Sequence, residues 1–276
     1  MSKERIDYIY DGSFQGFLCC VFLHYRKAAA AGIYQQGAYQ RDILTNYEIV
    51  ATCDEQAEIV YKAIQAKISD HDLKRAYSAF CSDDADKEMK ILRYLIRGFK
   101  QGPSIRLLHS DSDVFEVVQL ERRVNLEVHR MCGLVRFTEM RAGEYSDYRR
   151  SQDARQQKNL CILYAPIEPD NDITEFLAPH FVDRLREEAF IIHDKKRDKA
   201  LVYASNDWYI TDFKDEGLLR QTKAEEGYRR LWQLYFDTIA IRERTNPACQ
   251  KRMMPVRYWS NLAEFARKYD DMISVK

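Results

Sequence analysis

The chain has 276 residues, of which 46% are hydrophobic and 12% aromatic, a composition that favours a folded globular protein and excludes wholesale disorder. Its 43 basic and 43 acidic residues balance, so any nucleic-acid binding must come from a local basic patch rather than from bulk charge. The seven scattered cysteines form no CxxC pair, which predicts reduced thiols, no metal site and no cofactor.

The first half of the chain opens as strand, turn and helix. Ile6, Tyr8 and Tyr10 alternate as in a strand, Asp11-Gly12-Ser13 turns the chain, and apolar residues over 14–25 recur at helical spacing. A second strand is expected over 47–52. Helices are then expected over 54–68, 71–80, 86–99 and 113–131, the last ended by Gly133.

From residue 133 the hydrophobic period changes from helical to two. Strands are expected over 135–138, 160–164, 190–193, 200–203 and 208–213, with the last three forming a meander. A helix is expected over 172–188, a charged connection over 215–226, and helices over 231–240 and after Pro255.

These elements predict the α+β class. Residues 1–132 form a helix-rich part, and residues 133–276 form a mostly antiparallel sheet with helices packed on one face, followed by a C-terminal helical segment. The two regions are separate or form one continuous domain. The longest apolar run, over 16–23, is far below the roughly 20 residues of a membrane helix, and no cleavable signal pattern is present. We therefore expect a cytoplasmic protein that does not bind membranes.

The turn that contains Ser13 is a weak candidate phosphate site. It places backbone N–H groups at the start of a helix, where the positive end of the helix dipole favours an anion. It lacks the glycine fingerprint of a dinucleotide site and the GK[ST] of a P-loop. An ordinary helix cap, with Asp11 or Ser13 as acceptor, is the alternative and the favoured interpretation.

A second candidate site combines histidines with acidic and basic residues. His180 and Arg184 share a helix face, and His193-Asp194 ends a strand before a basic turn. If that strand end approaches the helix, His180, His193 and Asp194 form a catalytic acid–base group, with Arg184 gripping a phosphate. Surface histidines beside a solvated turn are the competing interpretation.

Arg136 follows the long helix in the stretch EVHRMCGLVRF and is a further candidate phosphate ligand. Glu127 and His129 of the same stretch point about 200° apart on a helix, which makes them poor joint metal ligands. Chain reversal at Gly133 is able to bring His129 towards Arg136. A helix-end histidine that interacts with the dipole is the simpler explanation.

The C-terminal segment is both basic and aromatic. Its candidate phosphate ligands are Arg242, Arg244, Lys251, Arg252 and Arg257. Aromatic rings accompany them and are able to stack on bases, but their helical spacing favours a core role: Trp232, Tyr235, Phe236, Tyr258 and Trp259.

Six blocks together resemble a known family: YDGSFQGFL, EVHRMCGLVRF, YAPIEPDNDI, APHFVDRL, IIHDKKRDKALVY and LWQLYFDTIAIRERTNPACQKRMMPVRYW. The chain is similar over nearly its whole length to an uncharacterised bacterial family of DNA-metabolism or DNA-repair proteins. Members accompany a radical-SAM protein, and some are fused to a uracil-DNA-glycosylase-like domain. The resemblance implies DNA and a radical-SAM protein as partners, with a separately encoded glycosylase-like protein as another. The chain lacks the CxxxCxxC cluster signature, so radical chemistry would belong to the partner.

Three hypotheses follow. The first is a DNA-binding accessory of a radical-SAM protein. The second is an enzyme that acts on a nucleic acid or nucleotide through the His180, His193 and Asp194 group. The third is an adaptor whose C-terminal aromatic surface docks a partner, which an exposed Trp259 would favour. No hydrolase, zincin or P-loop motif supports a familiar enzyme class.

Overall fold

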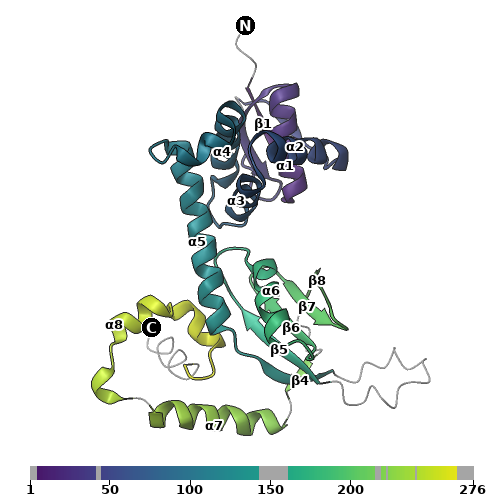
Figure 1. The fold of residues 1–276 in the computed structure, drawn as a ribbon. Helices are drawn as coiled ribbons and strands as arrows, with labels where there is room; N and C mark the ends of the chain where they lie inside the picture. The colour runs from purple at the N-terminus through teal and green to yellow at the C-terminus, as the bar shows by residue number, and fades with distance from the viewer. Residues whose placement is uncertain are drawn as a thin grey trace, which may run out of the picture. The chain divides into compact units, whose positions relative to one another are not determined.

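The chain divides into two compact units, residues 1–125 and 126–276. The structure, a computed structural model, describes residues 5–41, 45–142, 161–214, 219–221, 223–239 and 241–265. Each unit has a sheet of its own (Figure 1). Each unit also has its own cluster of buried hydrophobic residues. The boundary between the units falls inside helix α5 (Ser112–Leu134).

The first unit is built on a three-stranded parallel sheet. β1 (Arg5–Tyr10) lies between β2 (Ala29–Gln35) and β3 (Tyr47–Ile49). Parallel neighbours require a crossover connection, and α1 (Phe14–Arg26) supplies it between β1 and β2. The remaining helices are α2 (Asp54–Lys67), α3 (Asp70–Phe80), α4 (Lys87–Gln101), the 3-10 helix η1 (Gly102–Leu107) and the first part of α5.

The helices expected in this unit are confirmed, and their apolar faces meet in one core. Strand β2 was not expected. Its sequence, AAAGIYQ, begins with three alanines and a glycine, so it shows no alternation and only Ile33 and Tyr34 are residues typical of strands. Its pairing with β1 overrides that weak local preference.

The second unit contains a six-stranded mixed sheet in the order β8-β7-β6-β5-β4-β9. The strands are β4 (Thr138–Ala142), β5 (Cys161–Ile167), β6 (Phe190–Asp194), β7 (Lys199–Ala204), β8 (Asp207–Asp212) and β9 (Leu219–Gln221). The expected meander β6-β7-β8 is confirmed. Ser205 and Asn206 both have positive φ, as the tight two-residue turn between β7 and β8 requires.

One parallel pair interrupts the antiparallel pattern. β5 and β6 run parallel, and α6 (Thr174–Arg184) makes the crossover between them. The ring of Phe137 lies 5.4 Å from that of Phe181 on α6 and 5.7 Å from that of Phe190 on β6, so α6 covers the sheet face that carries Phe190.

The C-terminal segment is helical, as expected. It consists of α7 (Lys223–Ile239), the 3-10 helix η4 (Arg242–Arg244), α8 (Pro247–Met253) and the 3-10 helix η5 (Val256–Asn261). α7 begins well before Leu231, inside the expected connection over 215–226. Residues 215–218, 222 and 240 lie outside the described residues. Across the described ranges, no helix is long and apolar enough to cross a membrane.

Candidate functional site

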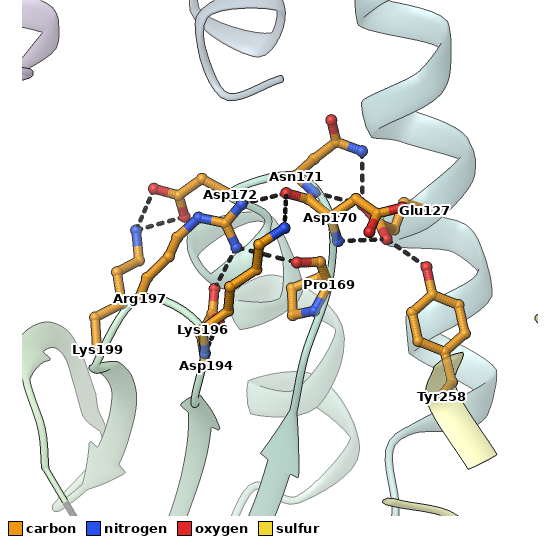
Figure 2. A network of polar contacts seen from close by, with 10 residues as sticks. All are labelled: Glu127, Pro169, Asp170, Asn171, Asp172, Asp194, Lys196, Arg197, Lys199 and Tyr258. Atoms are coloured by element: carbon orange, nitrogen blue, oxygen red, sulfur yellow. Dashed lines mark hydrogen bonds and ion pairs between the residues drawn. The ribbon is translucent and has the colours of Figure 1, made fainter. Parts of the chain in front are cut away.

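A buried carboxylate joins three elements of the second unit (Figure 2). Glu127 on α5 is 3% exposed and accepts the backbone N–H groups of Asp170 (2.9 Å) and Asn171 (2.8 Å). The side-chain amide of Asn171 (2.6 Å) and the hydroxyl of Tyr258 on η5 also donate to it. Burial alone would raise the pKa of Glu127, but these hydrogen bonds outweigh burial and hold the pKa below its usual value. Glu127 therefore fastens η5 and the loop after β5 to α5.

Arg257 completes this group, which we term the Glu127 cluster: Glu127, Asp170, Asn171, Arg257 and Tyr258. Its guanidinium lies 2.8 Å from the carboxylate of Asp170 and donates to the hydroxyl of Tyr258 at 2.8 Å. It also lies 3.6 Å from Glu127. Arg257, expected to contact phosphate, is instead occupied by acceptors of the protein itself.

A second polar cluster holds the turn between β6 and β7 (Figure 2). Asp194, fully buried, accepts the guanidinium of Arg197 (2.8 Å) and the backbone N–H of Lys196 (3.0 Å). Arg197 also donates to the carbonyls of Pro169 and Asp170. Burial raises the pKa of Asp194, and the Arg197 charge only partly opposes it. These contacts connect the turn to the loop before α6.

The expected catalytic group is not assembled. Side chains alternate along β6, so Phe190 and Asp194 share the face covered by α6, whereas His193 points to the opposite face. There His193 is 3% exposed, bonds the hydroxyl of Tyr164 (2.7 Å) and packs edge-on against Phe213.

His180 on α6 lies in contact with the ring of Phe181 and is exposed. The sheet therefore separates His180 from His193. The condition stated for this site, that the end of the strand brings His193 towards the helix of His180, is not met, because neighbouring strand residues face opposite ways. Arg184, at the end of α6, lines a cavity that His180 does not line.

Ser13 is the N-cap of α1. Its hydroxyl accepts the N–H of Gly16 (2.9 Å) and donates to Asp11 (2.6 Å), which also accepts the hydroxyl of Thr52 (2.8 Å). A Cβ on Gly16 would lie 2.4 Å from the Asp11 carboxylate, so glycine permits this close approach. The helix start already has its own carboxylate, which supports the capping interpretation over a phosphate site.

A cavity of about 900 Å³ opens within the second unit. Its wall comes from the segment after α5, the end of α6, one face of α7 and the segment after η5. Three arginines and five aromatic residues are among its described lining residues: Arg136, Arg184, Arg229, Phe137, Phe181, Tyr228, Trp232 and Tyr235.

Two of the three arginines are held by neighbours. Arg136 lies 2.8 Å from Glu264, and Arg229 donates to Thr138 at 2.9 Å. Within the described part of the chain, Arg184 has no acidic group within 4 Å. Its exposed guanidinium is therefore available to an anion from outside.

The aromatic residues of the C-terminal segment separate into two groups. Tyr258 (2% exposed) and Trp259 (5%) are core residues, as expected. Trp232 (42%) and Tyr235 (54%) are not, and the expectation that they fill the core is wrong. Their helix lines an open cavity, so regular spacing here produces an exposed stripe. Phe236 is half-buried against Phe265.

The other basic candidates do not gather in the cavity. Arg244, Lys251 and Arg252 are exposed, and none of them lines its described wall. The side chain of Arg242 lies outside the described residues. No group of three or more His, Cys, Asp or Glu side chains suited to a metal ion occurs in the described ranges.

The chain is a mixed helix-and-sheet protein whose second unit has a cavity lined by arginines and aromatic rings. Residues 85–264, more than half of the chain, match the family described as a domain of unknown function (DUF4130), and the chain belongs to that family. The cavity and both polar clusters lie within the matched residues. Searches of curated proteins and of solved structures gave no significant match.

Sequence reasoning missed two features of this site. Glu127 lies on the buried stripe of α5 with Val124 and Met131, and a carboxylate at such a position is a signal for a buried polar partner. Arg229 lies between the expected connection over 215–226 and the helix expected from Leu231, so its place on α7 was not anticipated.

Proposed function

We propose that this protein binds nucleic acid in DNA metabolism or repair, as an accessory to a radical-SAM protein, and that the cavity is its DNA-binding site. A uracil-DNA-glycosylase-like protein is a further proposed partner. The proposed role in DNA metabolism and the proposed partners rest on the sequence blocks described above. The proposed location of the DNA-binding site rests on the residues that line the cavity.

The observation that carries the proposal is the combination of exposed rings with arginines in one cavity. The whole chain is neutral, so nucleic acid can be attracted only locally. Arg184 supplies that local charge, because no described acidic group pairs with it, whereas Arg136 is paired with Glu264 and Arg229 with Glu225. Exposed Trp232 and Tyr235 supply surfaces on which bases stack.

The other two hypotheses have less support. An enzyme that uses His180 and His193 together is disfavoured, because the sheet separates them. An adaptor that docks through Trp259 is disfavoured because that ring is only 5% exposed.

The test is DNA binding to the full chain across a salt series. We expect affinity to fall linearly with salt on logarithmic axes, because displaced counterions drive phosphate binding. Arg184→Ala should weaken binding at low salt. It should also reduce the slope of log affinity against log salt concentration by roughly 0.7 to 0.9, the value for one phosphate contact.

Arg186→Ala is the matched control. Arg186 lies two residues away, is ion-paired with Asp183 at 2.6 Å, and does not line the cavity. Its replacement should leave the slope unchanged. Absence of binding at low salt, or equal effects of the two substitutions, would contradict the proposal.

The partnership has a separate test. Co-expression with a radical-SAM protein of the same bacterium, followed by size-exclusion chromatography, should give a complex. Separate elution at micromolar concentration would remove the partnership and leave the DNA-binding proposal standing.

A further inference from the structure

The inner face of α7 carries a row of aromatic residues. Tyr228, Trp232 and Tyr235 follow one another at i, i+4 and i+7, which places them on one side of the helix. All three line the cavity and remain 66%, 42% and 54% exposed. Aromatic side chains normally bury much of their large apolar surface. Three exposed rings in one row form a surface that a flat ligand is able to cover.

The spacing of these rings does not suit a stacked duplex. An α-helix rises 1.5 Å per residue, so consecutive rings of this row are separated by about 4.5 to 6 Å along its axis. Successive bases in a duplex are separated by about 3.4 Å. Rings at the wider spacing contact successive bases only where the strand is extended and its bases are unstacked.

The faces of the bases give a second reason. In a duplex, each base face is covered by its neighbour, so an aromatic side chain cannot stack on it without disrupting the helix. In a single strand the faces are free, and stacking on protein rings is tolerant of sequence. The rings of Trp232 and Tyr235 lie 5.8 Å apart at an interplanar angle of 33°, so they present neighbouring surfaces at different inclinations.

Two of the three arginines lie on other parts of the same wall, and Arg229 lies on α7 beside the rings. Arg184 comes from α6 and Arg136 from the segment before β4, whereas the rings come from α7. A strand that places its bases against α7 therefore meets cations on the walls formed by the other elements. Sites for single strands combine stacking aromatic side chains with positive charge in this way.

We propose that the cavity selects single-stranded over double-stranded DNA, with Tyr228, Trp232 and Tyr235 stacking on unpaired bases and Arg184 contacting the backbone. The inference rests on the proposed DNA-binding function and names the form of DNA that the site takes. The cavity, at about 900 Å³, is within the range of sites that enclose small ligands, which suits a short stretch of single strand rather than a duplex.

The experiment compares a fluorescent 15-nucleotide deoxythymidine strand with its duplex at low salt. We expect the single strand to bind at least about tenfold more tightly. Trp232→Ala should weaken single-strand binding by roughly fivefold to a hundredfold, the effect of losing one stacked base, and should weaken duplex binding by a much smaller factor. Trp208→Ala is the matched control, since Trp208 lies on β8, is 36% exposed and does not line the cavity.

Folding of each variant is checked by circular dichroism, and Tyr235→Ala provides a second test should Trp232→Ala fail to fold. Equal affinity for strand and duplex overturns this inference but leaves DNA binding in place. Equal effects of Trp232→Ala on strand and duplex have the same consequence. Absence of binding to either DNA overturns both proposals.

Discussion

The Glu127 cluster and the cavity both combine arginine with aromatic rings, but they leave these groups in different states. In the cluster, Tyr258 is 2% exposed and Arg257 contacts acceptors of the protein itself. In the cavity, Tyr235 is 54% exposed, and Arg184 has no acidic neighbour among the described residues. Arginine and tyrosine thus stabilise the fold where the protein itself offers hydrogen-bond acceptors, as in the cluster. Where no such acceptor is within reach, as for Arg184 in the cavity, the side chain stays open to contacts from outside the protein.

The largest expected effect is on stability, at the centre of the cluster. Glu127→Gln removes the charge that four donors surround and places an amide N–H among them. Because buried donors without an acceptor cost about 1 to 3 kcal/mol each, we expect a loss of about 2 to 4 kcal/mol in the free energy of unfolding. Urea unfolding followed by circular dichroism measures it.

Glu187→Gln is the control for this change, because Glu187 is exposed. It should alter stability by less than about 0.5 kcal/mol. Similar losses in the two variants would show that the cluster is not a principal support of the second unit.

Acid should release the same cluster. The folded-state pKa of Glu127 is lowered, so its contribution to stability is present above the unfolded-state pKa, about 4.3. It is lost as the pH falls through the folded-state value. Urea midpoints from pH 7 to pH 3 should therefore show the difference between wild type and Glu127→Gln shrinking below about pH 4. A difference that stays constant over this range would contradict the assignment.

Two tyrosines distinguish the cluster from the cavity. Tyr258→Phe removes one donor to Glu127 and should cost about 1 to 2 kcal/mol of stability, whereas Tyr235→Phe should cost almost nothing. Thermal unfolding of the two variants side by side is the measurement. Equal losses, or a larger loss for Tyr235→Phe, would reverse the roles given to the two sites.

The smallest effect is expected at Asp194. Its folded-state pKa is raised, so the stability contributed by its protonated form is lost as the pH rises through that value. At pH 7 the neutral Asp194→Asn loses the ion pair with Arg197 but avoids the burial of a charge. The net change should stay below about 1 kcal/mol in urea unfolding. A loss as large as that of Glu127→Gln would show that the two carboxylates have equivalent roles.

Periodicity predicted most of the helices and the β6-β7-β8 meander, because these elements bury one face and their sequences show it. It missed β2, whose small residues carry no pattern. It also placed Trp232 in the core, because helical spacing identifies a shared face but not what lies opposite that face. His180 and His193 were grouped by chemistry, yet only the register of β6 decides which side of the sheet His193 faces.

The DNA affinity of Arg184→Ala relative to Arg257→Ala tests the distinction between the two sites most directly. Both substitutions remove one partly exposed arginine from the second unit. With a labelled single strand at low salt, we predict that Arg184→Ala weakens binding about tenfold or more. Arg257→Ala should leave affinity within about twofold and instead lower stability by up to about 1 kcal/mol. Weaker binding by Arg257→Ala, together with unchanged binding by Arg184→Ala, would contradict the assignment of the cavity as the DNA-binding site.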